Sequence, residues 1–253
     1  MARIPAFLFC LFSPLAWKVK ASNYLSDSFS QFFNISYHLL RGRFETQIFR
    51  AKVADLNEVS NLVAIKGKEQ LERARAAGKG IILVTIHSPC FRIIQHWSNQ
   101  QEGLETWLIK HLFMQEDQAR NRLARFLHQQ QLEIYQGRIL DGNKIGDMKR
   151  AVRILAAGGS IIVCQDVGSS TAAPVRFMGR QKRYPLGASK LAEMGDAIIL
   201  PLVITNRTET KDWLIHFWPT IEPGDNSRQQ LLDTMEEMIL SYPEAWALWS
   251  WVI

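Results

Sequence analysis

Two side chains capable of acid–base chemistry stand directly after apolar runs of the sequence. His87 follows residues 80–86, GIILVTI, and Asp166 follows residues 160–165, SIIVCQ. A histidine whose ordinary pKa lies near neutrality can take a proton from a substrate, and a carboxylate beside it can orient the ring. The competing interpretation is that His87 is a buried histidine that only holds its loop in place. Residue type alone leaves both interpretations open.

The elements that must position these residues are predicted to be buried strands. Their apolar runs lack polar alternation, which is typical of strands covered on both faces. Further strands are predicted at 63–66, 104–109, 132–135, 197–204 and 214–218, and helices at 68–77, 116–130, 145–157, 185–194 and 227–241. This alternation predicts an α/β fold, a single domain with a mainly parallel central sheet flanked by helices. Ligands of such sheets bind at the carboxyl ends of the strands, where His87 and Asp166 stand.

Composition narrows the class of partner. The chain has 253 residues, 47% of them hydrophobic, which is enough for one sizeable core. Its three cysteines are far apart, so no zinc site or disulfide framework is predicted, and a reducing compartment fits best. The net charge of +6 is spread along the chain. It favours an anionic partner, either a phospholipid leaflet or an acidic carrier protein, and no nucleic-acid-binding motif is present.

The first twenty residues are predicted to form an apolar, helical membrane-interface segment, followed by the main domain at 21–253. Residues 4–17, IPAFLFCLFSPLAW, are apolar but too few for a bilayer crossing of about twenty residues. Lys18 and Lys20 follow, where they could meet anionic headgroups. A signal peptide and a helix packed on the domain are the other interpretations. A helical pattern continues over residues 22–61.

Four stretches together resemble the late acyltransferases of lipid A biosynthesis, within the lysophospholipid acyltransferase superfamily. Spanning roughly residues 60–253, they are GKGIILVTIHSPCF, GGSIIVCQDVG, APVRFMGR with the following RYPLGASKLAEMGDAIILPLVI, and EEMILSYPEAWALWSW. The resemblance implies transfer of an acyl group from acyl carrier protein or coenzyme A to a hydroxyl of a membrane lipid, without metal or redox cofactor. It also implies a histidine base with an acidic residue five places later. His87 matches the histidine, but Arg92 stands where the acid is expected.

An arginine cannot accept the ring N–H of histidine, so three explanations are open. Another carboxylate could orient His87, with Asp166 our choice and Glu102 and Glu105 behind it. The acceptor could be an amine, or the donor an aminoacyl or specialised acyl thioester. Catalysis could also be lost, which would leave a lipid- or carrier-binding protein that keeps the fold.

The remaining candidates lie in a loop that, by resemblance, shapes the acceptor site. Arg176, Phe177, Gly179 and Arg180 stand where the family has Pro-Phe-x-Gly-Arg, and we group them with Arg92 as substrate-binding residues. Glycine lets the backbone approach a ligand, and arginines can pair with phosphates. Backbone N–H groups near the strand ends are expected to hold the oxyanion. Trp246, Trp249 and Trp251 are expected either at a membrane interface or packed on the sheet edge.

The sequence therefore predicts a peripheral or monotopic acyltransferase at the cytoplasmic face of the inner membrane. His87 is the predicted base and Asp166 its orienting acid. The expected partners are an acyl carrier protein or acyl-CoA donor and an anionic membrane lipid. A soluble α/β hydrolase is disfavoured because the chain contains no Gly-x-Ser-x-Gly elbow.

Overall fold

The computed structural model describes residues 63–88, 91–110, 138–166, 174–184, 187–206 and 213–246. The predicted segment 1–20 and the helical pattern over 22–61 lie outside these residues. So do the predicted helix at 116–130 and the predicted strand at 132–135. The boundaries proposed for the two regions of the chain therefore stay predictions.

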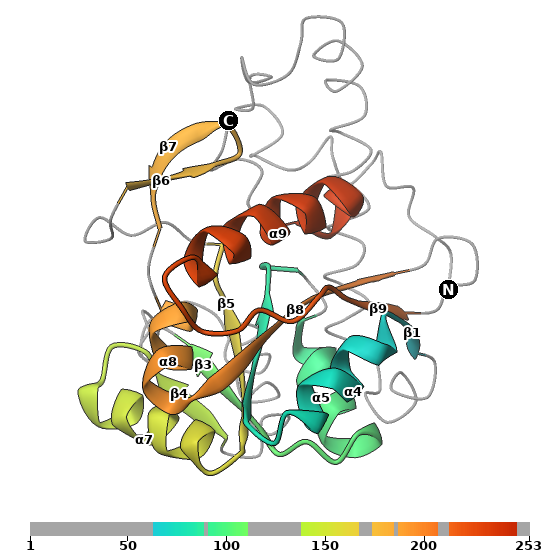
Figure 1. Ribbon diagram of the computed structural model, residues 1–253. Helices are drawn as coiled ribbons and strands as arrows, with labels where there is room; N and C mark the ends of the chain where they lie inside the picture. Colours follow the sequence, from blue (N-terminus) through green and yellow to red (C-terminus); the bar gives the residue numbers. More distant parts are fainter. Residues whose placement is uncertain are drawn as a thin grey trace, which may run out of the picture.

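The centre of the fold is one seven-stranded sheet in the order β1-β9-β8-β2-β5-β3-β4 (Figure 1). Five of the six neighbouring pairs are parallel, and only β8 and β9 pair in antiparallel fashion. The mainly parallel α/β sheet is thus confirmed, with a reversal at one edge. The strands are β1 (Val63–Lys66), β2 (Gly80–Thr85), β3 (Thr106–Lys110), β4 (Ile139–Asp141), β5 (Ser160–Cys164), β8 (Ala197–Asn206) and β9 (Trp213–Phe217).

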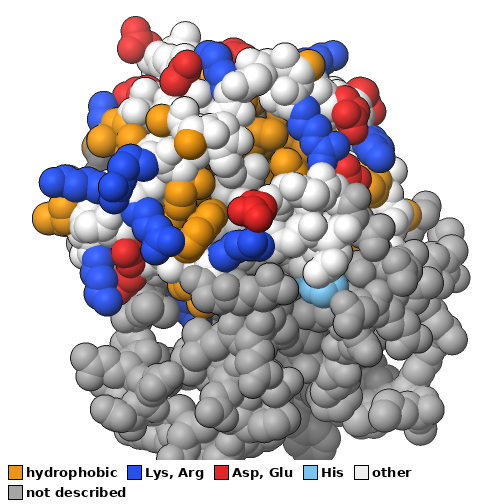
Figure 2. All heavy atoms as spheres, turned by 90° about the horizontal axis from the view of Figure 1, so that it is seen from below, with side chains coloured by type: hydrophobic (Ala, Val, Ile, Leu, Met, Phe, Trp, Pro, Cys, Tyr) orange, Lys and Arg blue, Asp and Glu red, His pale blue; other side chains and the backbone are white. Residues whose placement is uncertain are grey.

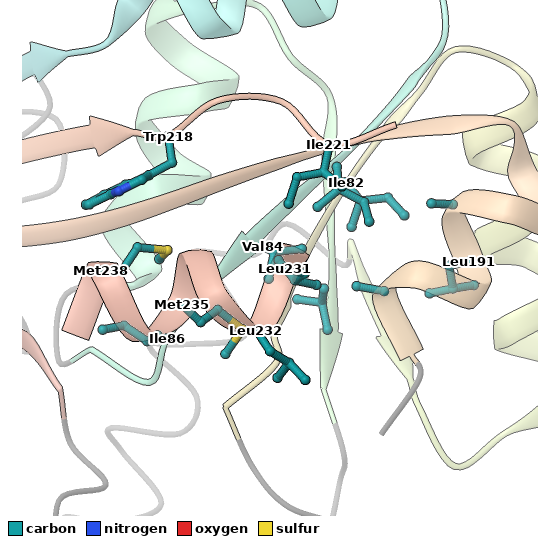
Figure 3. Close-up of a cluster of buried hydrophobic side chains, with 14 of the residues drawn as sticks. Ile82, Val84, Ile86, Leu191, Trp218, Ile221, Leu231, Leu232, Met235 and Met238 are labelled. Carbon is teal, nitrogen blue, oxygen red and sulfur yellow. The ribbon is translucent and has the colours of Figure 1, made fainter. Parts of the chain in front are cut away.

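Helices cover both faces of this sheet. One face carries α4 (Lys68–Ala76) and α5 (Phe91–Gln101), whose apolar residues join the cluster around Ile81 and Leu83. The other carries α7 (Ile145–Ala156), α8 (Gly187–Gly195) and α9 (Ser227–Ser241). Residues 82, 84 and 86 point toward α9, where they meet Leu231, Leu232, Met235 and Met238 (Figure 3). Because alternate residues of β2 are buried on opposite faces, its unbroken apolar run is explained.

Three local features of the structure differ from the sequence prediction. Residues 139–141 form β4, where no strand was predicted. Three residues are too few to show a strand pattern in the sequence. The loop predicted at 173–184 is a hairpin of β6 (Pro174–Phe177) and β7 (Arg180–Arg183). Helix α5 had no prediction, since its apolar residues follow the histidine loop directly.

Close backbone packing fixes the start of β2. A Cβ on Gly80 would lie 2.4 Å from the carbonyl oxygen of Leu155, so only glycine lets α7 lie this close to the strand. Gly78 ends α4 with a positive φ of 66°, as expected of a glycine after a helix. These two glycines explain the Gly-Lys-Gly break before the strand that leads to His87.

Charged side chains of both signs are present on the face seen in Figure 2. On the face seen in Figure 2, Lys and Arg side chains are spread over the described part, with Asp and Glu side chains among them. This distribution agrees with basic residues that are scattered along the sequence rather than gathered in a tail. The predicted anionic partner is therefore not located by charge on this face.

Candidate active site

The register of two parallel strands brings His87 and Asp166 together. In the pairing of β2 with β5, Thr85 lies opposite Cys164. The ladder continues one step further, because the N–H of Gln165 donates to the carbonyl of Thr85 at 3.1 Å. His87 and Asp166 each stand two residues beyond the paired positions. Equal offsets from neighbouring parallel strands therefore place the two side chains side by side.

Asp166 contacts His87 through both of its carboxylate oxygens. Oδ1 lies 2.5 Å from Nδ1 of the imidazole ring. Oδ2 accepts the backbone N–H of His87 at 2.8 Å. The Asp166 side chain is fully buried, whereas the His87 side chain is 39% exposed. With Nδ1 held by the carboxylate, Nε2 is the ring nitrogen left to meet a substrate.

A third N–H group reaches the same carboxylate from the end of the chain. Nε1 of Trp246 donates to Oδ2 of Asp166 at 2.8 Å. Trp246 is only 2% exposed, so it is packed inside the protein. The interpretation that places it at a membrane interface is therefore wrong. Sequence spacing could not reveal this contact, because eighty residues separate the two partners.

The electrostatics of the site favour a positive charge on His87. Burial lowers the pKa of His87, but the hydrogen bond and the negative charge of Asp166 together raise it above its ordinary value of 6.5. The pKa of the Cys164 thiol is raised well above its ordinary value, first by burial and then by the charge of Asp166. The pKa of Tyr184 is raised by burial and by the charges of Asp166 and Glu236. Both raised pKa values favour the neutral thiol and the neutral phenol at physiological pH.

The predicted substrate loop is the β6–β7 hairpin, and its Phe177 and Met178 belong to the same hydrophobic cluster as the buried residues of α9. Phe177 is buried and its ring lies 4.5 Å from that of Tyr184, whose pKa the charge of Asp166 affects. Met178 and Gly179 form the turn with φ of 50° and 67°. The Met178 N–H donates to Oε1 of Glu236 on α9 at 2.5 Å, so α9 supports this turn. A glycine in the sequence could indicate the turn, but nothing indicated Glu236.

Three arginines, Arg92, Arg176 and Arg180, are predicted to bind substrate. Arg176 is exposed on the outer face of the hairpin, opposite Gln181. Arg92 lies in the first turn of α5, and Arg180 begins β7. The side chains of Arg92 and Arg180 lie outside the described part of the protein. Their assignment to substrate binding stays a prediction.

Glu102 and Glu105 are separated from His87 by the length of the sheet. Both precede β3, which runs parallel to β5, so they lie at the amino edge of the strands. Glu102 accepts a hydrogen bond from Nη1 of Arg75 at 2.8 Å, and Glu105 lies 3.3 Å from Nη2 of Arg138. Neither glutamate orients His87.

Several N–H groups expected to hold an oxyanion are already occupied. The N–H of His87 donates to Asp166, that of Ser88 to the carbonyl of Ile86 at 2.7 Å, and that of Gln165 to Thr85. The strand ends therefore use these donors to build the site. Gln165 contributes in another way, since its side-chain Oε1 accepts the N–H of Ala188 at 3.1 Å and fixes the start of α8.

Within the described ranges, no group of three or more potential metal ligands comes together. In those same ranges, no helix has the length and hydropathy of a membrane span.

The family model described as bacterial lipid A biosynthesis acyltransferase matches residues 40–250, which include both His87 and Asp166. A comparison with curated proteins finds no match.

Proposed function

The chain belongs to the bacterial lipid A biosynthesis acyltransferase family, and from this premise we propose that it is a membrane-associated acyltransferase with His87 as general base. It moves an acyl or aminoacyl group from a thioester of a carrier protein or coenzyme A to a hydroxyl or amine of a lipid. The observation that carries the proposal is the hydrogen bond of 2.5 Å between Nδ1 of His87 and a fully buried Asp166. A partly exposed imidazole backed by a carboxylate is the arrangement that a proton acceptor needs.

In the proposed reaction, the acceptor O–H or N–H lies against Nε2 of His87. Its proton passes to Nε2 while the acceptor atom bonds to the thioester carbonyl carbon. The tetrahedral intermediate then collapses, the C–S bond breaks, and Nε2 returns the proton to the departing thiolate. Asp166 holds the ring through Nδ1 and stabilises the imidazolium formed in between. No protein nucleophile is required, because the acceptor itself attacks.

Asp166 supplies the carboxylate that Arg92 lacks. Among the three explanations for an arginine five places after His87, the contact between Asp166 and His87 supports the first, an orienting acid from another strand. The register of β2 and β5 supplies this acid without any residue of α5. An unusual donor or an amine acceptor stays compatible with the same geometry, since Asp166 acts on the base and not on the substrates.

The proposed location is the cytoplasmic face of the inner membrane, with the protein bound at the surface. Lipid A acyltransferases act on membrane lipids, which supports a membrane-associated chain. The predicted interfacial segment at 1–20 would supply the attachment. Arg176 and Arg183, both exposed on the β6–β7 hairpin, are suited to the phosphates of an anionic lipid.

The test is acyl transfer by the full chain with His87→Ala. The probes are acyl carrier protein and coenzyme A thioesters of several chain lengths, with lysophospholipid in anionic vesicles, and thiol release is measured. Removing the base should lower the rate about 100- to 10,000-fold. His216→Ala is the matched control, because His216 is a partly buried histidine of the same sheet that does not contact Asp166 in the described structure.

The outcomes separate the two functions. Loss of transfer in His87→Ala with activity kept in His216→Ala supports the base. Equal activity of wild type and His87→Ala on a thioester that responds would end the mechanism. Binding of carrier protein or vesicles without any thiol release would instead favour the non-catalytic alternative.

A further inference from the structure

The buried indole N–H of Trp246 donates a hydrogen bond to the Asp166 carboxylate, which in turn holds His87. We propose that Trp246 is a positioning residue for the His87–Asp166 pair, so that the segment at 242–246 completes the active site. The kinetic part of this inference rests on the proposed acyltransferase function. The structural part, control of the imidazole through Asp166, does not.

A short helical turn brings Trp246 to this position. Helix α9 ends at Ser241, and Tyr242 leaves the helical conformation with φ of −137°. Pro243 then starts the 3-10 turn η2 (Pro243–Ala245), closed by the N–H of Ala245 donating to the carbonyl of Tyr242 at 2.9 Å. Trp246 follows in an extended conformation. Proline fixes its own φ and cannot continue α9, so the chain turns back toward β5.

The three N–H groups divide the two carboxylate oxygens unequally. The His87 backbone and the Trp246 indole both donate to Oδ2, each at 2.8 Å. Oδ1 is thereby left for Nδ1 of the imidazole. Two donors on one oxygen fix the rotation of the carboxylate about its Cβ–Cγ bond, and this aims Oδ1 at the ring. Removing the indole N–H takes away one of those two constraints.

Packing alone does not account for a tryptophan here. A buried carboxylate is costly unless hydrogen bonds compensate its charge, and a buried indole N–H needs an acceptor. Trp246 and Asp166 meet both needs with one bond. Trp218 offers the comparison, since it is 3% exposed in the same hydrophobic cluster, and its described ring contacts are with His216 and Tyr242. One tryptophan fills the core, and the other also supports the site.

The experiment compares Trp246→Phe with Trp218→Phe in the full chain, each removing an indole N–H and keeping an aromatic ring. The His87 pKa is followed by NMR of the labelled imidazole. In Trp246→Phe the His87 pKa should fall toward the ordinary value of 6.5. The hydrogen bond between Nδ1 and Oδ1 of Asp166 is one cause of the raised pKa, and loss of the indole N–H should weaken that bond. Trp218→Phe should keep the wild-type value. An unchanged or higher His87 pKa in Trp246→Phe would overturn the proposal.

Kinetics provide the second measurement. Trp246→Phe should lower kcat about ten-fold with little change in KM, and shift the acidic limb of the pH–rate profile down with the His87 pKa. A ten-fold loss that appears equally in Trp218→Phe would show a general packing effect and count against the inference. If wild type transfers no acyl group, the proposed function fails, yet the NMR comparison still decides the role of Trp246.

A measurement on the wild-type protein tests the proposal even if Trp246→Phe does not fold. The indole N–H signal of Trp246, observed in protein labelled with 15N-tryptophan, should shift with the same midpoint as the His87 ring. The Trp218 signal should not follow that midpoint. A Trp246 signal that is independent of the His87 titration would contradict the coupling.

Discussion

His87 follows β2 and His216 lies on β9 of the same sheet, but their surroundings shift their pKa values in opposite directions. Burial lowers the pKa of both rings. At His87 the hydrogen bond and charge of Asp166 outweigh burial and raise the pKa above 6.5. At His216, burial and the positive charge of Lys66 lower it to about 4, although the charges of Glu237 and Glu69 act the other way.

The contacts of His216 explain why it stays neutral. Its Nδ1 lies 3.1 Å from the hydroxyl of Tyr242, and its ring centre lies 3.9 Å from that of Trp218. An aromatic neighbour and a neutral phenol do not compensate a charged imidazole as a carboxylate does. His216 is therefore a packing residue on β9, between the parallel strand β1 and the antiparallel strand β8. His87 stands at the carboxyl end of parallel strands, where the chain supplies a carboxylate.

This comparison shows that the partner, more than burial, decides what an imidazole can do. Both rings are partly buried and both accept or donate one hydrogen bond through Nδ1. Only the His87 pair combines a charged partner with a ring that is 39% exposed. A site that accepts and returns protons needs both properties.

Asp166→Asn should have the largest effect on the difference between the His87 and His216 pKa values. Asparagine keeps the size of the side chain but removes the charge, so burial is left as the dominant effect and the His87 pKa should fall below 6.5. Transfer should drop about 100- to 10,000-fold, because the ring loses its orienting acid. Imidazole NMR and the pH dependence of kcat/KM would measure the two effects.

Asp141→Asn is the control for Asp166→Asn, since Asp141 is also a buried aspartate at a strand end, on β4. It should leave the His87 pKa where it is. A His87 pKa that stays above 6.5 in Asp166→Asn would show that another group raises it.

A smaller effect is expected on stability against pH. His87, with its pKa raised in the fold, stabilises the protein below pH 6.5, and this is lost as pH rises through its folded value. His216 does the reverse, because the unfolded chain takes up a proton between pH 6.5 and about 4 that the folded protein does not. Together the two rings favour greatest stability near pH 6.5.

His216→Phe should remove the loss of folding stability that His216 causes below pH 6.5. Relative to wild type, the variant should gain on the order of 1–2 kcal/mol in unfolding free energy between pH 6.5 and 4, after allowance for solvent screening at a partly buried ring. Denaturant unfolding at several pH values measures the difference. His87→Gln should instead reduce the fall of the unfolding free energy above pH 6.5. Parallel curves for wild type and His216→Phe would contradict the lowered pKa.

The sequence predicted this site unevenly, and particular residues show why. His87 and Asp166 were predictable because unbroken apolar runs identify β2 and β5, and parallel neighbours place equal offsets together. The order β8-β2-β5-β3 cannot be read from periodicity, so the choice of Asp166 over Glu102 depended on an assumed neighbour relation. The structure supplies that relation through the register of β2 with β5.

Trp246, Glu236 and Gln165 were missed for a different reason. Each acts at the site through a side-chain hydrogen bond to a residue far along the chain, with separations of 80, 58 and 23 residues. No local pattern encodes such a bond, because it depends on how α8, α9 and η2 pack on the sheet. The β6–β7 hairpin was missed because its exposed cations resemble a solvated loop.

The smallest predicted effect separates burial from charge at His216. Lys66 lies opposite His216 in the parallel pairing of β1 and β9, and its charge is the second cause of the lowered pKa after burial. Lys66→Gln should therefore raise the His216 pKa by less than about one unit, since the charge of an exposed lysine is screened by water. Lys68→Gln, two residues away and paired with Glu102, is the control. NMR titration should show a rise only for Lys66→Gln, and a return to 6.5 would mean that charge, and not burial, keeps His216 neutral.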